Sequence, residues 1–356
     1  MKKVTVKSEL IKKALSKLGA AVSSRSVLPA LENIFCSVEG NTISMTTCDT
    51  EMMVKYNLTA DADEPFEFFI PFHLFKNIVG LCKEEVIEFE TLKTAVKVRI
   101  GKDVYTLKFN AKLEEFPKLS KAPSQHEIAF DNKYIDMMLA ATESASKSEA
   151  TPSLSRICLN INYTGIDIVG TDGFILYKYN SPAELKVTTT LLLSPRMVKA
   201  IEGLEEMVIK WNDQKFSFST PDILIVVNRP EYHYPNYLAI IPQGVSNLTV
   251  TKSELVDTFK KLNICNTKTA VLQLSSSSIK AQVDDKETGS KINAEMNCVN
   301  TGEVTDIALN AADVLRLLHQ TTCENLELSI LAFNKAVVFR GEDPNYLALI
   351  IPIFNK

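Results

Sequence analysis

The chain has 356 residues, of which 46% are hydrophobic and 23% are charged, the composition of an ordinary globular protein. Its 39 lysines and arginines are outnumbered by 43 aspartates and glutamates, giving a net charge of −4, which argues against a simple basic nucleic-acid coat or tail. A protein with one basic face stays possible. No segment approaches the roughly 20 apolar residues of a membrane span, and no apolar core of a signal peptide follows the first lysines.

The reactive residue types show no pattern typical of a cofactor site. The seven cysteines are widely spaced without a CxxC pair, which is typical of reduced thiols in a cytoplasmic protein. The 12 glycines form no phosphate-binding loop, and the four histidines lack the spacing of metal ligands. We therefore expect neither a metal nor a cofactor.

The first element, a strand followed by an amphipathic helix over residues 4–15, occurs three times. It returns at residues 128–139 and 248–259. Each copy has a residue that can cap the helix, with offsets of 124 and 121 residues between copies: Ser8, Asn132 and Ser253. Apolar residues recur behind the cap at helical spacing, which predicts a buried helix face.

A second strand that runs into a helix also occurs three times, at residues 66–75, 191–198 and 307–314. Pro71 and Pro195 are 124 residues apart, the same offset as the first two caps, and proline is tolerated in the first turn of a helix. Strands with alternating polarity fill the stretches between these markers.

The copies also end alike. The second and third copies end in related segments, residues 234–242 and 344–352, which share Pro-Asn-Tyr-Leu-Ala. We therefore predict an α+β protein of three tandem domains, each built from two βαβββ halves. The predicted domains span residues 1–124, 125–245 and 246–356.

Five local motifs lie in order on this repeat. They are Arg25-Ser26-Val27-Leu28-Pro29, Thr47-Cys48-Asp49-Thr50-Glu51-Met52, Thr171-Asp172-Gly173-Phe174, Ser194-Pro195-Arg196 and Ile351-Pro352-Ile353. Together with the threefold repeat, they resemble the bacterial sliding clamp family, the beta subunit of DNA polymerase III. The resemblance covers the whole chain.

This resemblance implies a function without catalysis. Two chains would close head to tail into a homodimeric ring of six domains, with sheets outside and helices inside. The ring would encircle duplex DNA without reading its sequence and hold a polymerase at high effective concentration. Implied partners are the catalytic subunit of DNA polymerase III, the clamp loader, and other polymerases and repair proteins that carry short clamp-binding peptides.

The resemblance and the helix patterns together predict residues that face DNA. They are Arg25, Arg196, Lys12, Lys17, His73, Lys147 and Lys199. Contacts of such residues with phosphates would be independent of sequence and sensitive to salt. The alternative is that these are ordinary lysines on exposed helix faces. Where the family has aromatic and basic loop residues, this chain has Thr151, Pro152 and Ser153.

The resemblance also implies a peptide-binding site between the second and third domains. Its residues would be Leu154, Thr171, Gly173, Phe174, Ile175, Leu176, Pro235, Ala239, Ile240, Ile351, Pro352, Ile353 and Phe354. Because Ile175 and Ala239 replace basic residues of the family, we expect a more apolar site with an altered motif preference. The alternative is that the residues after the Thr-Asp-Gly turn are simply core.

Two other functions remain open from the residues alone. A hydrolase could use Asp172 with His233 or Asp49, although an aspartate that stabilises the turn before Gly173 is the simpler interpretation. A monomeric repeat scaffold could bind peptides without encircling DNA. Ring closure would need paired sheet edges, for which Ile264 is a candidate neighbour.

Overall fold

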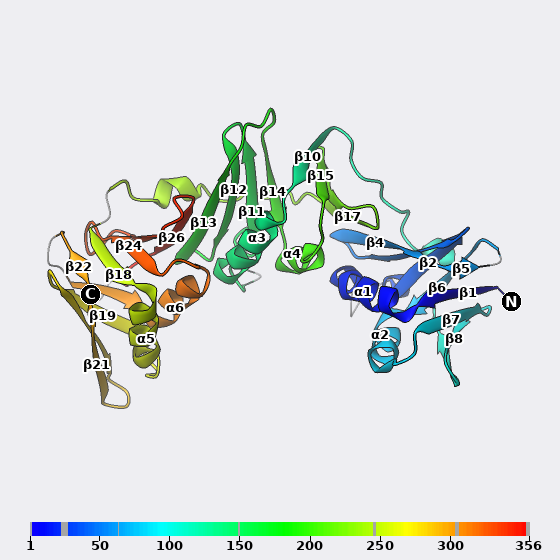
Figure 1. Ribbon diagram of the computed structural model, residues 1–356, viewed down its shortest axis with the longest axis horizontal. Coiled ribbons are helices and arrows are strands. Elements are labelled where there is room, and N and C mark those ends of the chain that lie inside the picture. The colour runs from blue at the N-terminus through cyan, green and yellow to red at the C-terminus, as the bar shows by residue number, and fades with distance from the viewer. Residues whose placement is uncertain are drawn as a thin grey trace. The chain divides into compact units, whose positions relative to one another are not determined.

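The computed structural model describes residues 2–22, 28–62, 64–148, 150–244, 247–302 and 306–353. The chain divides into two compact units, one made of residues 1–135 and 196–230 and the other of residues 136–195 and 231–356 (Figure 1). Residues 125–245, predicted to form one domain, thus contribute to both units. The predicted domain boundaries stay a prediction.

The first unit contains a five-stranded sheet in the order β5-β1-β7-β8-β9 and an eight-stranded sheet in the order β10-β15-β16-β17-β4-β3-β2-β6. Its strands are β1 (Lys3–Lys7), β2 (Asn33–Glu39), β3 (Thr42–Cys48), β4 (Met52–Thr59), β5 (Asp61–Ala62), β6 (Phe66–Pro71), β7 (Val86–Thr91), β8 (Ala95–Ile100), β9 (Asp103–Lys108), β10 (His126–Phe130), β15 (Met207–Trp211), β16 (Lys215–Ser219) and β17 (Ile223–Asn228). Its helices are α1 (Ser8–Leu18), α2 (Phe72–Leu81) and α4 (Pro195–Ile201).

The second unit contains a nine-stranded sheet in the order β14-β11-β12-β13-β26-β25-β24-β18-β22 and a four-stranded sheet in the order β21-β20-β19-β23. Its strands are β11 (Ile157–Asn162), β12 (Gly165–Thr171), β13 (Ile175–Pro182), β14 (Thr189–Leu193), β18 (Leu248–Thr251), β19 (Thr269–Leu274), β20 (Ser278–Asp285), β21 (Ser290–Asn297), β22 (Val299–Asn300), β23 (Asp306–Asn310), β24 (Asn325–Ser329), β25 (Val337–Arg340) and β26 (Tyr346–Ile350). Its helices are α3 (Lys133–Ser144), α5 (Lys252–Leu262) and α6 (Ala311–His319).

The predicted helices form in all three copies, but α1 and α5 begin closer to their strands than expected. Ser8 is the first residue of α1 rather than its cap, and its hydroxyl donates to the Glu84 carbonyl. In the third copy, Thr251 caps α5 by accepting from the Glu254 N–H. Helices α1 and α5 follow their strands so directly that the last strand residue, Lys7 or Thr251, takes the cap position, so the cap predictions at Ser8 and Ser253 were wrong.

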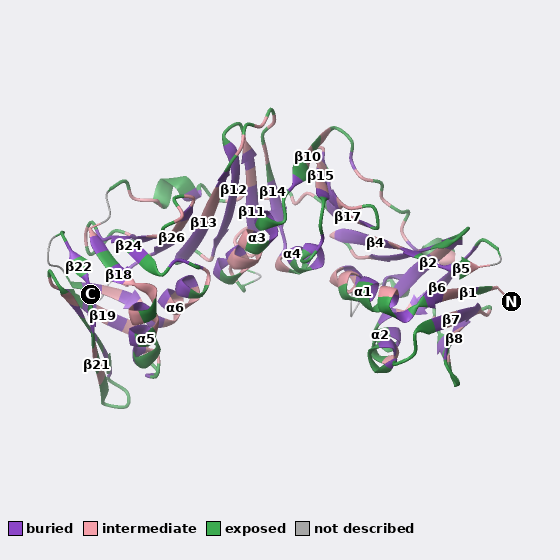
Figure 2. Cartoon of the chain, in the orientation of Figure 1, coloured by how far each residue is buried: buried purple, intermediate pink, exposed green. Residues whose placement is uncertain are grey.

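The helices bury one face and expose the other (Figure 2). Helix α1 buries Ile11, Ala14, Leu15 and Leu18 where it packs against β1, β3 and β4, whereas Leu10, the remaining apolar position of the predicted face, is half-buried. Each fully buried leucine or isoleucine stabilises the fold by about 1.5–3 kcal/mol. Polar helix faces are thereby left to solvent.

Two segments, one after β9 and one after β17, each pack on one face of a large sheet. In the first unit, Phe116 stacks on Phe35 and also contacts Phe69. In the second unit, Tyr237 packs into a cluster that includes Leu176 and Leu349. Among the described residues, no helix combines the length and the apolar character needed to cross a membrane.

Candidate DNA-facing and peptide-binding sites

The turn between β12 and β13 is fixed by Asp172. One oxygen of its carboxylate accepts the backbone N–H groups of Phe174, at 2.9 Å, and Ile175, at 3.0 Å. Gly173 has φ +96°, a conformation that residues with a Cβ rarely adopt. The Thr-Asp-Gly sequence therefore forms a tight turn that leaves Phe174 67% exposed.

Arg316 on α6 binds the second oxygen of Asp172 at 2.8 Å and Asp313 at 2.9 Å. It also donates to the Glu143 carbonyl near the end of α3, at 2.8 Å. Burial alone lowers the pKa of Arg316 and is the largest single effect, but the bonds and charges of Asp172 and Asp313 outweigh it, so the pKa is raised. Arg316 was not recognised in the sequence, where nothing separated it from other helix arginines.

The structure brings the C-terminal part of the predicted peptide site next to this turn. Ile175 pairs with Ile350 across the sheet, and the Ile351 N–H donates to the Phe174 carbonyl at 2.8 Å. Ile175 and Leu176 are fully buried, whereas Ile351 and Ile353 are half-buried. Thr171 and Pro352 are also buried.

The other predicted residues lie on neighbouring segments. Leu154 contacts Gly173, since a Cβ on that glycine would stand 3.8 Å from a Leu154 methyl carbon. Pro235 and Ala239 are exposed, and Ile240 is 43% exposed. Leu238, which the sequence analysis missed, is 56% exposed beside them. Phe354 lies outside the described residues.

Tyr237 anchors the short 3-10 turn Tyr237–Ile240, which carries Leu238 and Ile240. Its hydroxyl donates to the buried carboxylate of Asp167 at 2.9 Å. The other oxygen of Asp167 binds Lys178 at 2.6 Å and Asn180 at 2.8 Å. Burial, and secondarily the charge of Asp167, raises the pKa of Tyr237 well above its usual range. This network was also invisible in the sequence.

The first unit repeats the arrangement around Asp172. One oxygen of Asp49 accepts the N–H groups of Glu51 and Met52, both at 2.8 Å. Arg196 donates to the other oxygen of Asp49 and to the Glu51 carboxylate. Burial, the largest single effect, lowers the pKa of Arg196. The hydrogen bonds and charges of the two carboxylates together raise it by more, so the net shift of the pKa is upward. Arg196 therefore faces acidic partners within its own unit.

Two of the lysines predicted to face DNA bind the C-terminal ends of helices. Lys12 donates to the Cys82 carbonyl after α2, at 2.8 Å, and Lys17 donates to the Glu202 carbonyl after α4. Cations are favourable at helix C-termini because the last carbonyls lack backbone partners. Burial lowers the pKa of Lys17, partly offset by Glu202.

The remaining predicted basic residues are placed differently. His73, Lys147 and Lys199 are exposed. Arg25 lies outside the described residues. Lys13 on α1 and Lys260 and Lys261 on α5 are exposed as well.

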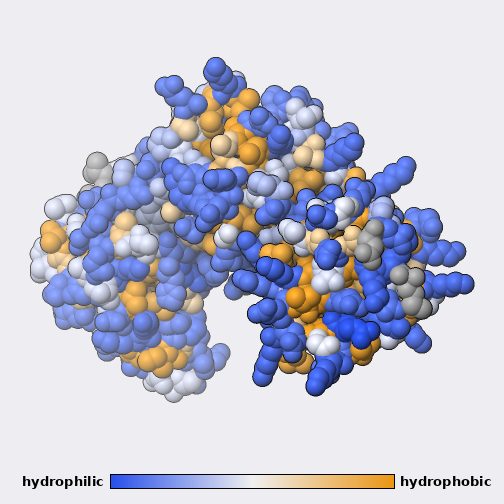
Figure 3. All heavy atoms as spheres, turned by 45° about the vertical axis from the view of Figure 1, so that its right-hand side comes forward, coloured by the Kyte–Doolittle hydropathy of each residue, from blue (hydrophilic) through white to orange (hydrophobic). Residues whose placement is uncertain are grey.

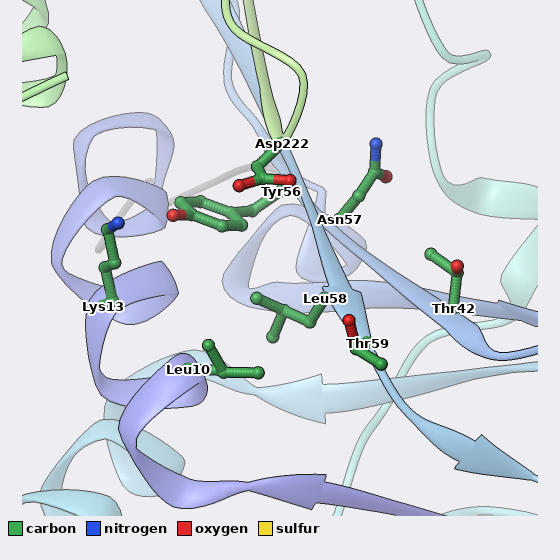
Figure 4. A pocket seen from close by; sticks show the side chains of 8 residues that line it. All are labelled: Leu10, Lys13, Thr42, Tyr56, Asn57, Leu58, Thr59 and Asp222. Atoms are coloured by element: carbon green, nitrogen blue, oxygen red, sulfur yellow. The ribbon is translucent and has the colours of Figure 1, made fainter. Parts of the chain in front are cut away.

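A small hollow adjoins Lys13 in the first unit (Figure 4). Its volume is about 180 Å³, below the roughly 300–1,000 Å³ of ordinary ligand sites. Lys13, the Tyr56 hydroxyl and Asp222 lie along one side, with Leu10 and Leu58 on another (Figure 4). The hollow shows no further cation or anion cluster, so we assign it no ligand.

The surface gives no sign of a catalytic centre at the aspartate considered for a hydrolase. Both oxygens of Asp172 are engaged, by two N–H groups and by Arg316, which supports the interpretation as a turn-stabilising residue. Within the described residues, no three His, Cys, Asp or Glu side chains cluster as metal ligands would. The visible surface is largely hydrophilic with separate apolar patches (Figure 3).

Comparisons with known proteins agree with the motifs. Residues 2–120 match the family model of the DNA polymerase III beta subunit, N-terminal domain. The chain is 23% identical to the beta sliding clamp of Caulobacter vibrioides, over 98% of this chain and 95% of the relative. It is 20% identical to that of Pseudomonas putida, over 97% and 98% of the two chains.

Solved structures show the same fold. The DNA polymerase III beta subunit of Thermotoga maritima superposes with a TM-score of 0.93 at 20% identity, covering 100% of both chains. A Pseudomonas aeruginosa sliding clamp bound to griselimycin superposes with a TM-score of 0.92 at 19% identity, covering 99% of this chain and 100% of the other. The predicted α+β clamp fold and the resemblance to the DNA polymerase III beta subunit family are thereby confirmed.

Proposed function

We propose that this protein is a DNA sliding clamp: two copies join head to tail into a ring that encircles duplex DNA and tethers a replicative polymerase. One observation carries the proposal, namely the repeated pairing of strands between successive copies of the repeat. Strand β17 pairs with β4 in the first unit, and β26 pairs with β13 in the second, both antiparallel.

The third pair of equivalent strands consists of the sheet edges β21 and β9. Strand β21 comes after β19 and β20, so it corresponds to β4, which comes after β2 and β3. Strand β9 comes after β7 and β8, so it corresponds to β17, which comes after β15 and β16. Each of the two ends its sheet. Long free edges are rarely left exposed in soluble proteins. Pairing β21 of one copy with β9 of a second copy would repeat the two existing junctions.

Exposed apolar side chains near these edges support the same contact. Val104 on β9 is 49% exposed, and Leu74 and Leu81 on α2 of the same repeat are 51% and 84% exposed. In the last repeat, Ile264 after α5 is 76% exposed. A contact between two different surfaces generates a ring when its rotation closes.

In such a ring, exposed helix residues would contact phosphates. We assign this role to exposed His73, Lys147 and Lys199. Lys12, Lys17 and Arg196 already bind carbonyls or carboxylates, so they would add less. A few weak phosphate contacts would let a clamp slide, and they would be independent of base sequence.

The apolar surface of the second unit would bind the partners. Phe174, Leu238 and Ile240 are exposed there, and Ile351 and Ile353 are half-buried. We propose that it takes short peptides with aliphatic and aromatic anchors, which carry most of the energy in such contacts. The partners would be the replicative polymerase, the clamp loader, and other polymerases and repair proteins.

Retention on DNA tests the ring. The protein is loaded by a clamp loader onto nicked circular DNA, which is then cut once with a restriction enzyme. A topological clamp stays on the circle and slides off the linear product. If the protein stays bound after the circle is cut, the topological mechanism is wrong. Sedimentation distinguishes the dimeric ring from the alternative of a monomeric peptide scaffold. The scaffold would show the mass of one chain at micromolar concentration.

A further inference from the structure

We propose that Arg316 is a positioning residue for the peptide site. From α6 it holds two separate segments that present site residues, the turn with Phe174 and the end of α3 that leads to Leu154. This inference rests on the proposed peptide-binding function. It concerns a residue outside the apolar surface itself.

The first segment is the turn after β12. Asp172 holds the Phe174 and Ile175 N–H groups with one oxygen and binds Arg316 at 2.8 Å with the other. The carboxylate is thus shared between the turn and α6. Because Phe174 is 67% exposed, few packing contacts of its own fix its position. The orientation of its backbone depends on Asp172 at the N–H and on the Ile351 N–H at the carbonyl, and the orientation of Asp172 depends on Arg316.

The second segment begins at the end of α3. Arg316 donates to the Glu143 carbonyl at 2.8 Å. Ser144 next to it donates to the Gln320 side chain, and Gln320 donates back to the Arg316 carbonyl. Beyond α3, the Leu154 carbonyl accepts the Ser146 N–H at 2.8 Å.

Arginine suits this position because its planar fork donates in several directions at once. Arg316 binds two carboxylates and one carbonyl, and its side chain is 28% exposed. Lysine would supply a single charged group without the fork. Binding a peptide to ordered segments avoids the cost of ordering them on association. Loss of Arg316 should therefore weaken peptide binding although Arg316 is no member of the apolar surface.

The first unit offers a matched control. Arg196 and Asp49 repeat the same arrangement, with two N–H groups on one oxygen of the aspartate and an arginine on the other. The turn that Asp49 holds carries Thr50 and Glu51 in place of an exposed aromatic residue. Replacing Arg196 removes an equivalent interaction without touching the peptide site.

The experiment compares the full-length wild type with Arg316→Ala, Arg316→Lys and Arg196→Ala. The probe is a fluorescent synthetic peptide with one leucine and one phenylalanine anchor, and the readout is anisotropy. Hydrogen exchange of the Phe174 and Ile175 amides is measured in parallel. All measurements are made at a temperature where circular dichroism shows every variant folded.

Arg316→Ala should weaken peptide binding by about tenfold and speed exchange at Phe174 and Ile175. Arg316→Lys should restore part of both, and Arg196→Ala should bind within about twofold of wild type, because Arg196 belongs to the other unit and binds Asp49 and Glu51 there. Unchanged exchange at Phe174 and Ile175 in Arg316→Ala, or unchanged affinity, overturns the positioning role. Failure of the wild type to bind the peptide, with Phe174→Ala behaving alike, instead overturns the proposed peptide-binding function.

Discussion

Gly170 on β12 lies directly against the carbonyl oxygen of Ala141 on α3. A Cβ placed on Gly170 would stand 2.0 Å from that oxygen and 2.9 Å from the carbonyl carbon. Rotation of a side chain cannot relieve such a clash, because both Ala141 atoms belong to the helix backbone. The absence of a Cβ therefore lets α3 approach the sheet in the second unit.

Gly170→Ala should destabilise the protein because α3 must move away from β12. The expected cost is about 1–3 kcal/mol, the usual range for overpacking. Gly80→Ala is the matched control, since Gly80 lies in α2 with no atom within 4 Å of the added Cβ. There alanine should stabilise slightly through its helix propensity. Urea unfolding midpoints measure both; equal midpoints for wild type and Gly170→Ala would contradict the argument.

Sequence patterns predicted the repeated architecture because periodicity and turn residues report local structure. The apolar stripe of α1 and the Thr-Asp-Gly turn at Asp172 both appear as expected. The strand pairing of β13 with β26, between residues far apart in sequence, could not be deduced from one chain. It was not among the features predicted from the sequence.

The hydrogen-bond partners of the charged side chains could not be predicted from the sequence. Lys12 and Lys17 fall outside the apolar stripe, which says only that they are not core. Their ammonium groups bind helix ends 70 and 185 residues away. Arg316 and Tyr237 were overlooked for the same reason, since each acts through a carboxylate far away in the sequence, Asp172 in a turn and Asp167 on β12.

Substitutions of Lys17 and Lys199 should distinguish a lysine that stabilises the fold from a lysine that contacts DNA. Lys17→Met removes the donor at the end of α4 and should cost about 1 kcal/mol of unfolding free energy. Lys199→Met removes an exposed charge and should change stability by less than about 0.5 kcal/mol. Lys199→Met should also bind short linear duplex DNA less tightly, and its affinity should fall less steeply with salt. Equal salt sensitivity in wild type and Lys199→Met would argue against a phosphate contact there.

Val104→Asp should disrupt the proposed dimer because it places a carboxylate at the exposed edge strand β9. The expected sedimentation mass at micromolar concentration is that of one chain. Val299→Asp is the control, because Val299 is also exposed, at 64%, on the edge strand β22, which has no place in the proposed contact. If both variants sediment as wild type does, β9 is not the contact surface.

Stability should fall as the pH rises from 9 to 10 because of buried thiols. Burial, with Asp167 nearby, raises the pKa of Cys158 from 9.0 to about 12. Above pH 9 the unfolded thiol releases its proton while the folded one keeps it, so the unfolded state is favoured. One such group contributes up to about 1.4 kcal/mol per pH unit. The window ends at the ordinary tyrosine pKa of 10.0, so unfolded tyrosines keep most of their protons over most of it.

Cys158→Ala tests this dependence. Its unfolding free energy, measured in urea, should be lower than that of wild type at pH 8 because a buried side chain is shortened. Between pH 9 and 10, however, it should decline less steeply. Parallel declines in the two proteins would show that Cys158 does not contribute.

Tyr237→Phe should weaken both the fold and the peptide site. The substitution removes the hydrogen bond from the hydroxyl to Asp167, a buried charged acceptor, and should cost about 1.5–3 kcal/mol. Because Tyr237 anchors the turn that carries Leu238 and Ile240, peptide affinity should also fall. Tyr163→Phe is the control, since Tyr163 is 66% exposed. Lower stability with unchanged peptide affinity would show that the turn keeps its position without this bond, and would confine Tyr237 to a structural role.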